Sequence, residues 1–353
     1  MGTRRRRHEE RPPPQTSRDS LAAELDEGEG DQAESLPARI SRYGRAKERA
    51  VSMRDYLINH TAVLRASADE GIHSLVVERE AVEAAKVAGL LDGCGNYLHF
   101  RHYYTVDQVL LHAACFCKQH LVCPLCAIRR GSKTLEAYLK RFEVIRAQQP
   151  GLSAYLMTLT VMDGADLPER YQHLNRSFKV LKDRRRYYLA GTRGAPWTEF
   201  AKVQGAVGSY EVKRGKGSGL WHPHVHMVVL CETPIDPIAL KQEWEQITGD
   251  SFIIDVRPFH KDQEPAQGFM EVFKYAVKFS DLSLADNWEV ARYLRGSRLL
   301  FSLGAFRGVQ VPDQLTDEPL EELPYFDLFY RYFAGSGYSY IAAPERQAVR
   351  VVT

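Results

Sequence analysis

The stretch His222-Pro-His-Val-His-Met-Val-Val-Leu230 alternates histidine with other residues and runs on into an apolar segment. This alternation predicts a β-strand, in which every second side chain lies on the same face. His224 and His226 are therefore expected on one face, while Val225 can face a core. Two imidazoles on one face supply half of a divalent metal site, and three alternating histidines in a chain with only 12 favour that interpretation over a pair of surface histidines.

The preceding segment offers a third metal ligand. Val203 to Lys213 is predicted to be a strand, and the glycine-rich turn Arg214 to Gly219 joins it to the histidine strand as a hairpin. Glu211 would then lie beside the histidines, although the sequence does not fix the register and a solvent-facing carboxylate is equally consistent. His222 is the alternative ligand. Mixed histidine and carboxylate ligands with open positions suit Mg²⁺ or Mn²⁺ bound to a phosphate.

Outward from this hairpin, strands and helices alternate in a regular order. Further strands are expected at Tyr155–Val161 and Phe252–Val256, and helices at Pro168–Arg186, Pro237–Ile247 and Gln267–Ser280. The resulting order, β-α-β-β-α-β-α, is that of a ferredoxin-like α+β domain, an antiparallel sheet with helices on one side. A helix at Asn287–Arg295 and a strand at Arg298–Phe306 are expected to follow.

The 353 residues are long enough for about two domains. Residues 1–36 have few large apolar side chains and are expected to form a disordered tail. Residues 37–150 are expected to be a helical region that contains a cysteine cluster, residues 151–310 the α+β domain, and residues 311–353 a C-terminal extension without an assigned role. The chain has no apolar run of membrane-spanning length and no secretory signal, so a cytoplasmic protein without a membrane partner is expected.

Four of the six cysteines lie in one short window. Their spacing, C-x-C-x₅-C-x₂-C, includes the C-x₂-C pair typical of zinc sites, and predicts structural Zn²⁺. His112 and His120 are alternative ligands, and unligated buried thiols are the alternative to a metal site. Cys94 and Cys231 stand apart from the cluster. The four cysteines are Cys115, Cys117, Cys123 and Cys126.

The formal net charge is only +2, so any surface that binds nucleic acid must arise from local clusters of basic residues. Arg129 and Arg130 follow the cysteines at once and could face phosphate. A second cluster, on the helix after the first strand, contains Lys182, Arg184, Arg185 and Arg186, with two tyrosines beside it. It could hold single-stranded DNA by charge and stacking, or be a solvated helix end.

A second pattern of chemical interest begins at Glu271 in the segment Glu-Val-Phe-Lys-Tyr-Ala-Val-Lys278. On a helix, Glu271, Tyr275 and Lys278 share one face. Tyrosine is a poor nucleophile while protonated, and a neighbouring carboxylate or cation can assist the loss of its proton. By itself this pattern is more typical of a packed tyrosine flanked by solvated charges.

Together these patterns resemble the HUH endonuclease superfamily, which carries two histidines around one hydrophobic residue on a strand and a catalytic tyrosine on a later helix. More narrowly, the chain is similar to plasmid rolling-circle replication initiators (Rep proteins) with a single catalytic tyrosine, over about Cys115 to Phe306. The motifs that carry this resemblance are Leu156-Met-Thr-Leu-Thr160, Pro223-His-Val-His226, Glu271 with Tyr275 and Lys278, Cys123-Pro-Leu-Cys126 with Arg129-Arg130, and the segment Gly296 to Phe306.

The resemblance implies an enzyme that nicks one strand of single-stranded or cruciform origin DNA. Tyr275 would form a 5′-phosphotyrosine link and leave a free 3′-OH for the host polymerase, with a host helicase as a further partner. Glu271 would activate a water at termination, because an esterified tyrosine cannot be reused. The competing hypotheses are a non-catalytic DNA-binding regulator that contains zinc, a related transposase or relaxase, and a metallo-hydrolase, for which a second set of ligands is lacking.

Overall fold

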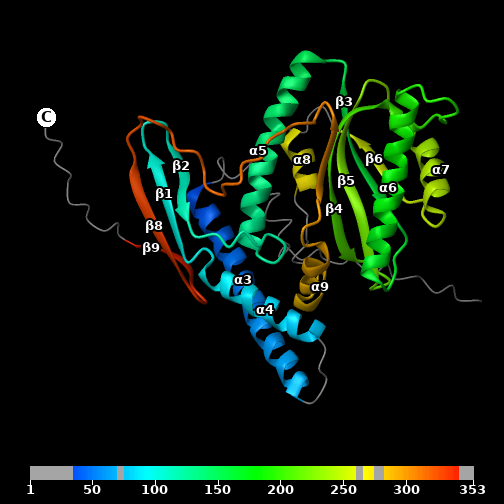
Figure 1. Cartoon of the computed structure of the whole chain (residues 1–353). Helices are drawn as coiled ribbons and strands as arrows, with labels where there is room; N and C mark the ends of the chain where they lie inside the picture. Colours follow the sequence, from blue (N-terminus) through cyan, green and yellow to red (C-terminus); the bar gives the residue numbers. More distant parts are fainter. Residues whose placement is uncertain (1–34, 70–74, 260–264, 274–281, 342–353) are drawn as a thin grey trace, which may run out of the picture.

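The computed structural model of the chain describes residues 35–69, 75–259, 265–273 and 282–341. Its strands form two antiparallel sheets, one with the order β6-β3-β5-β4-β7 and one with the order β2-β1-β8-β9 (Figure 1). The strands are β1 Tyr97–Tyr103, β2 Gln108–Ala114, β3 Ser153–Thr160, β4 Val203–Arg214, β5 Trp221–Cys231, β6 Ile254–Pro258, β7 Leu300–Gly304, β8 Phe326–Phe333 and β9 Gly337–Ile341. The helices are α3 Leu36–Asp69, α4 Leu75–Gly93, α5 Pro124–Gln148, α6 Leu167–Leu189, the short η1 Glu199–Lys202, α7 Pro237–Thr248, α8 Pro265–Phe273 and α9 Leu284–Leu294.

The five-stranded sheet follows the expected order of elements, β3-α6-β4-β5-α7-β6. β5 lies between β3 and β4, β3 lies between β5 and β6, and β7 adds an edge strand beside β4. Local sequence sets where the two crossover helices begin. The side chains of Asp166 and Asp236 cap α6 and α7 by accepting hydrogen bonds from free backbone N–H groups of the first turn.

Helices cover both faces of this sheet. Met157 and Val225 pack with α6 and α7 on one face, whereas Val207 and Val228 pack with α5 and α8 on the other. Figure 1 shows α5 and α8 on one side of the sheet and α6 and α7 on the opposite side. The prediction of helices on one side was therefore wrong. Because the central strands carry apolar side chains on both faces, both faces need cover.

In β5, alternate side chains lie on opposite faces of the sheet, as the sequence predicted. Val225, Met227 and Val229 point into the core beside α6. His224 and His226 alternate with them and so lie on the opposite face, which is the face that α5 and α8 cover. The position of the histidines on this face determines which neighbouring elements can take part in the candidate site.

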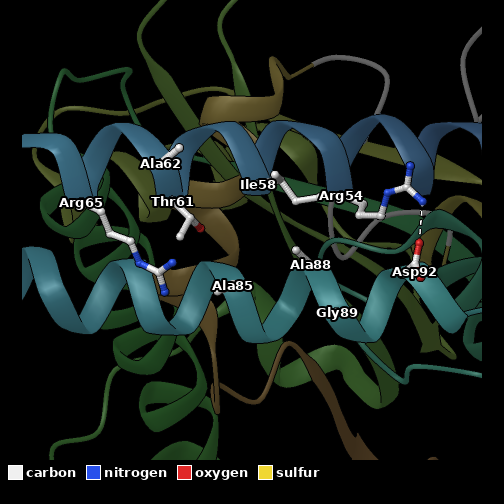
Figure 2. A pocket seen from close by; sticks show the side chains of 9 residues that line it. All are labelled: Arg54, Ile58, Thr61, Ala62, Arg65, Ala85, Ala88, Gly89 and Asp92. Atoms are coloured by element: carbon white, nitrogen blue, oxygen red, sulfur yellow. Dashed lines mark hydrogen bonds and ion pairs between the residues drawn. The ribbon is translucent and has the colours of Figure 1, made fainter.

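α3 and α4 form a helical hairpin ahead of the cysteine cluster, as expected for this region. A groove of about 640 Å³ runs between them, lined by small residues such as Ala62, Ala85 and Gly89 (Figure 2). At one end, Arg54 forms an ion pair with Asp92 at 2.6 Å. Figure 1 places this hairpin away from the five-stranded sheet.

The four-stranded sheet was not predicted. β1 and β2 form a hairpin within the region expected to be helical, and β8 and β9 come from the C-terminal extension. β8 pairs directly with β1, from Tyr97 opposite Arg331 to His102 opposite Phe326. The extension therefore belongs structurally with the region around the cysteine cluster, since its strands complete a sheet that the earlier hairpin begins.

Candidate functional site

The hairpin of β4 and β5 brings three candidate ligands together. Its register places Glu211 directly opposite His224. The Nε2 atoms of His224 and His226 lie 2.9 and 3.0 Å from the same carboxylate oxygen, Oε2 of Glu211. Glu211 and His224 are buried, while the His226 side chain is 19 % exposed. Of the two ligands that the sequence left open, the structure therefore brings Glu211 to the histidine pair.

Two further contacts orient the imidazole rings. Nδ1 of His226 lies 2.8 Å from the hydroxyl oxygen of Thr158, the residue opposite it on β3. Nδ1 of His224 lies 3.3 Å from the carbonyl oxygen of His222.

The electrostatics of the cluster favour a bound cation. Burial lowers the pKa of His224 to about 4, although Glu211 opposes the shift. Burial alone would raise the pKa of Glu211, but His224 and His226 outweigh it and hold that pKa well below its usual range. The cluster thus combines a buried carboxylate that stays ionised with a buried imidazole whose protonated form is disfavoured, and a positive ion at this place would stabilise the carboxylate.

The spacing of the donor atoms fits a divalent ion. Two ligand atoms at right angles, each about 2.1 Å from one ion, lie about 3.0 Å apart. The two nitrogen-to-oxygen distances of 2.9 and 3.0 Å match this value. Glu211, His224 and His226 form one of the two groups among the described residues that could hold a metal ion.

His222 does not join this group. Its Nδ1 bonds instead to the carboxylate of Asp163, which also accepts from the hydroxyl of Ser218. Asp163 and Thr158 are the residues near the site that sequence reasoning did not assign. For Thr158 a signal existed, because it lies in the motif after Leu156 and on the strand that pairs with β5.

The expected nucleophile falls outside the described residues. Tyr275 and Lys278 lie in the segment 274–281, and Glu271 belongs to α8, although its side chain is not described. The last described turn of α8 nevertheless touches the sheet close to the histidine cluster. The hydroxyl of Ser209 donates to the carbonyl oxygen of Val272 at 2.5 Å. Ser209 lies two residues before Glu211 on β4 and pairs with His226.

The second candidate metal group consists of four cysteines, but not the four that the sequence predicted. Cys94, Cys117, Cys123 and Cys126 come together, with three sulfur-to-sulfur distances of 3.6 Å. Sulfur atoms held tetrahedrally at about 2.3 Å from one zinc ion would lie about 3.8 Å apart, so the group fits such an ion. Cys115 is exposed and lies outside this group.

A tight turn explains why Cys94 replaces Cys115. Gly95 has a φ of 65°, a conformation that L side chains rarely adopt. It turns the chain from α4 into β1, and its N–H donates to the carbonyl of Cys115 at 2.7 Å. The hairpin of β1 and β2 thus returns Cys115 beside Gly95, so Cys94 takes the place in the cluster. His112 instead contacts the ring of His99 edge to face.

The two arginines after the cysteines have different environments. Arg129 is completely buried and forms an ion pair with Asp317 at 2.6 Å, so the expectation that it faces phosphate was wrong. Arg130 is 38 % exposed and donates to the carbonyl of Pro312 at 2.8 Å. Arg129 lies three residues after Cys126 on the buried face of α5, whereas Arg130, the next residue, is partly exposed.

The basic cluster on α6 lies on the far face of the sheet from the histidine cluster. Its helix packs with Met157 and Val225, on the face opposite His224 and His226. Its side chains also have partners within the protein. Lys182 lies over the ring of Phe178, Arg184 pairs with Glu243 at 3.3 Å, Arg185 donates to the carbonyl of Val203 at 2.6 Å, and Arg186 pairs with Asp183 at 3.1 Å.

Among the described residues, no helix combines the length and apolar character needed to span a bilayer.

Comparison with known proteins gives one family. No curated protein and no solved structure matches the chain. A family model described as "Replication protein" matches residues 108–324, which include both candidate metal groups except Cys94. The chain therefore belongs to this family of replication proteins, which supports a role as a plasmid replication initiator.

Proposed function

We propose that the chain is an HUH endonuclease that nicks and rejoins one strand of a plasmid origin to start and end rolling-circle replication. The membership in a replication protein family supports this proposal. So does the order of the central strands, β6-β3-β5-β4, which is that of a ferredoxin-like sheet. In this proposal the residues around Glu211 form the nicking site and the origin strand is the substrate.

The observation that carries the proposal is the buried cluster of Glu211, His224 and His226 on the sheet face that α8 also covers. Val272 in the last turn of α8 accepts a hydrogen bond from Ser209, beside this cluster. Tyr275 is the third residue after Val272, and three residues span at most about 11 Å. This short chain distance from Val272 supports the proposal that the Tyr275 phenol attacks a phosphate held at the cluster.

In the proposed reaction the phenol oxygen of Tyr275 bonds to the phosphorus, and the bond from phosphorus to the 3′ oxygen breaks. The phenol proton passes to solvent, and Lys278, three residues after the tyrosine in sequence, stabilises the phenolate. The departing 3′ oxygen takes up a proton from solvent and becomes the primer end for a host polymerase, with a host helicase as a further partner.

A divalent ion, Mg²⁺ or Mn²⁺, held by Glu211, His224 and His226 would polarise the phosphate. Thr158 and the His222 carbonyl keep the two imidazoles turned toward Glu211. At termination Glu271 would remove a proton from water, so that the second cut ends in hydrolysis and release. We also propose that Cys94, Cys117, Cys123 and Cys126 hold a structural Zn²⁺ that braces the loop before α5.

The test is a search for a covalent adduct. The full-length protein is incubated with single-stranded origin DNA and Mn²⁺, and adducts are separated under denaturing conditions. We expect an adduct with the wild type and none with Tyr275→Phe. An adduct formed by Tyr275→Phe would refute the assignment of the nucleophile. Absence of any adduct, together with retained DNA binding, would favour a non-catalytic DNA-binding regulator.

A second variant tests the role in termination. Glu271→Ala should still form the adduct but fail to release the terminated strand by hydrolysis. Equal loss of both steps would argue against separate roles for Tyr275 and Glu271.

A further inference from the structure

A cavity of about 260 Å³ opens where α5, β4, the end of α8 and the segment 297–300 meet. Apolar and polar side chains contribute about equally to its walls, so a ligand with both an apolar and a charged part would suit it. Ligand-binding pockets commonly measure about 300–1,000 Å³. A cavity of about 260 Å³ is therefore suited to a small ligand. The residues used below are Arg130, Gly131, Ser209, Phe273, Arg298 and His120, all of which line it.

The cavity adjoins the proposed nicking site. Ser209 lines it and lies two residues before Glu211 on the same face of β4. Residues two apart on a strand are separated by about 7 Å. A group bound in the cavity would therefore lie next to a phosphate held at Glu211, His224 and His226, at the spacing of neighbouring units in one DNA strand.

The charged and aromatic groups of the lining suit a nucleotide. Arg130 comes from α5 and Arg298 from the segment before β7, so two arginines from different elements line the cavity, and Arg130 also donates to the Pro312 carbonyl at 2.8 Å. The guanidinium of Arg130 forms an ion pair with the carboxylate of Asp313 at 3.6 Å, and the Asp313 side chain is 96 % exposed. Arginine binds phosphate well. The partly buried ring of Phe273 packs against Tyr138 and Phe269 and also lines the cavity, where it would add an aromatic contact for a base.

Gly131 keeps the cavity open. It lies within α5, where glycine costs about 1 kcal/mol relative to alanine. Packing does not require it, because a Cβ at this position would meet the Phe273 carbonyl oxygen at 3.5 Å, an ordinary contact. A larger side chain, however, would extend into the cavity that Gly131 lines.

The cysteine cluster supports the same walls. His120 lies in the loop between Cys117 and Cys123, and it lines the cavity. Arg130 lies about one helical turn after Cys126 on α5. The group of four cysteines therefore fixes both the loop and the helix start from which one side of the cavity is built.

We infer that this cavity holds one nucleotide of the origin strand beside the phosphate that is cut, with its base against Phe273 and its phosphates at Arg130 and Arg298. The claim that the cut phosphate lies beside this nucleotide rests on the proposed function. The claim that the cavity binds one nucleotide of a DNA strand does not depend on it. The inference assigns these residues to strand positioning, and it gives the cysteine cluster a role in shaping the nucleotide site.

The test measures binding without cleavage. Full-length protein carrying Tyr275→Phe is titrated into a fluorescent oligothymidylate, and Gly131→Leu and Arg298→Ala are compared in this background. Each should weaken binding at least about fivefold, the lower end of the effect of losing one stacked base. Matched controls are Gly89→Leu, a helical glycine with open space around it, and Arg193→Ala, an exposed arginine in the turn after α6. Both should bind as the parent does.

Photo-crosslinking with an oligonucleotide that contains 5-iodouracil then locates the base. We expect crosslinked peptides that contain Phe273 or His120. Crosslinks only elsewhere, or unchanged binding by both Arg298→Ala and a folded Gly131→Leu, would overturn the inference. Binding of free thymidine triphosphate as tight as that of the oligonucleotide would also overturn it. Failure of the proposed function appears separately, as absence of the covalent adduct with the wild-type protein.

Discussion

Arg129 and Asp317 form a fully buried ion pair, although 188 positions separate them in the sequence. The arginine belongs to α5, just after the cysteine cluster, and the aspartate belongs to the segment that leads to β8. Arg39 and Lys133 approach the same carboxylate at 3.4 and 3.3 Å, and the backbone N–H of Leu111 donates to it at 2.7 Å. Asp317 therefore joins α3, α5 and β2 at one point.

Asp317→Asn should strongly destabilise the protein. The substitution keeps the size of the side chain but removes the buried negative charge that faces Arg129, Arg39 and Lys133. Removing one partner of a buried ion pair typically costs about 3–5 kcal/mol. The free energy of unfolding from urea titrations measures the effect. Asp313→Asn, a change at a 96 % exposed carboxylate, should have little effect; similar losses in both variants would contradict this account.

The same carboxylate predicts a loss of stability in acid. Burial would raise the pKa of Asp317, but Arg129 and Arg39 outweigh it and lower the pKa to about 2. The unfolded chain should have a pKa of about 3.9. Because the folded pKa is the lower one, the stabilisation is complete above about pH 4 and is lost as the pH falls toward 2, by about 2–3 kcal/mol. The difference in melting temperature between wild type and Asp317→Asn should therefore shrink over this range; a constant difference would refute the assignment.

Cys94→Ser and Cys115→Ser should differ in metal content. Cys94 lies among the four clustered thiols, and Cys115 is exposed. We expect Cys94→Ser to lose tightly bound metal and to melt at a lower temperature, whereas Cys115→Ser should keep both properties. Elemental analysis of the purified proteins, with thermal melting, makes the comparison. Retention of metal by Cys94→Ser with loss in Cys115→Ser would restore the set of ligands expected from sequence spacing.

Thr158→Val should weaken metal binding at the histidine cluster without altering the ligands. The substitution keeps the shape but removes the hydroxyl that contacts Nδ1 of His226. Loss of such a supporting contact typically lowers metal affinity by about 10–100-fold. Calorimetric titration with Mn²⁺ provides the measurement. Thr160→Val, whose hydroxyl donates to the Ile253 carbonyl instead, should leave the affinity unchanged, and an equal effect in both would count against a role for Thr158.

The parts of the site that sequence reasoning anticipated are those set by local periodicity. The two-residue repeat of β5 places His224 and His226 on one face, and the hairpin brings β4 alongside. The choice between Glu211 and His222 depends on register, which a long glycine-rich turn does not fix. In the structure Glu211 lies opposite His224, whereas His222 faces Asp163.

The parts that were missed depend on contacts distant in sequence. Nothing in the segment around Tyr97 identifies β8, more than two hundred residues later, as its partner. Cys94 was not assigned to the cluster because the hairpin of β1 and β2 separates it in sequence from the other cysteines. Arg129 was expected to face phosphate, but its buried partner, Asp317, lies 188 positions later in the sequence.

The place of β8 between β1 and β9 also constrains biosynthesis. The first hairpin of this sheet emerges from the ribosome long before Phe326–Ile341 has been translated. Until then β1 presents an open row of backbone donors and acceptors, the kind of edge that recruits strands from other molecules. Premature termination before β8 would leave that edge permanently uncovered, so shortened products should aggregate rather than persist as separate folding units.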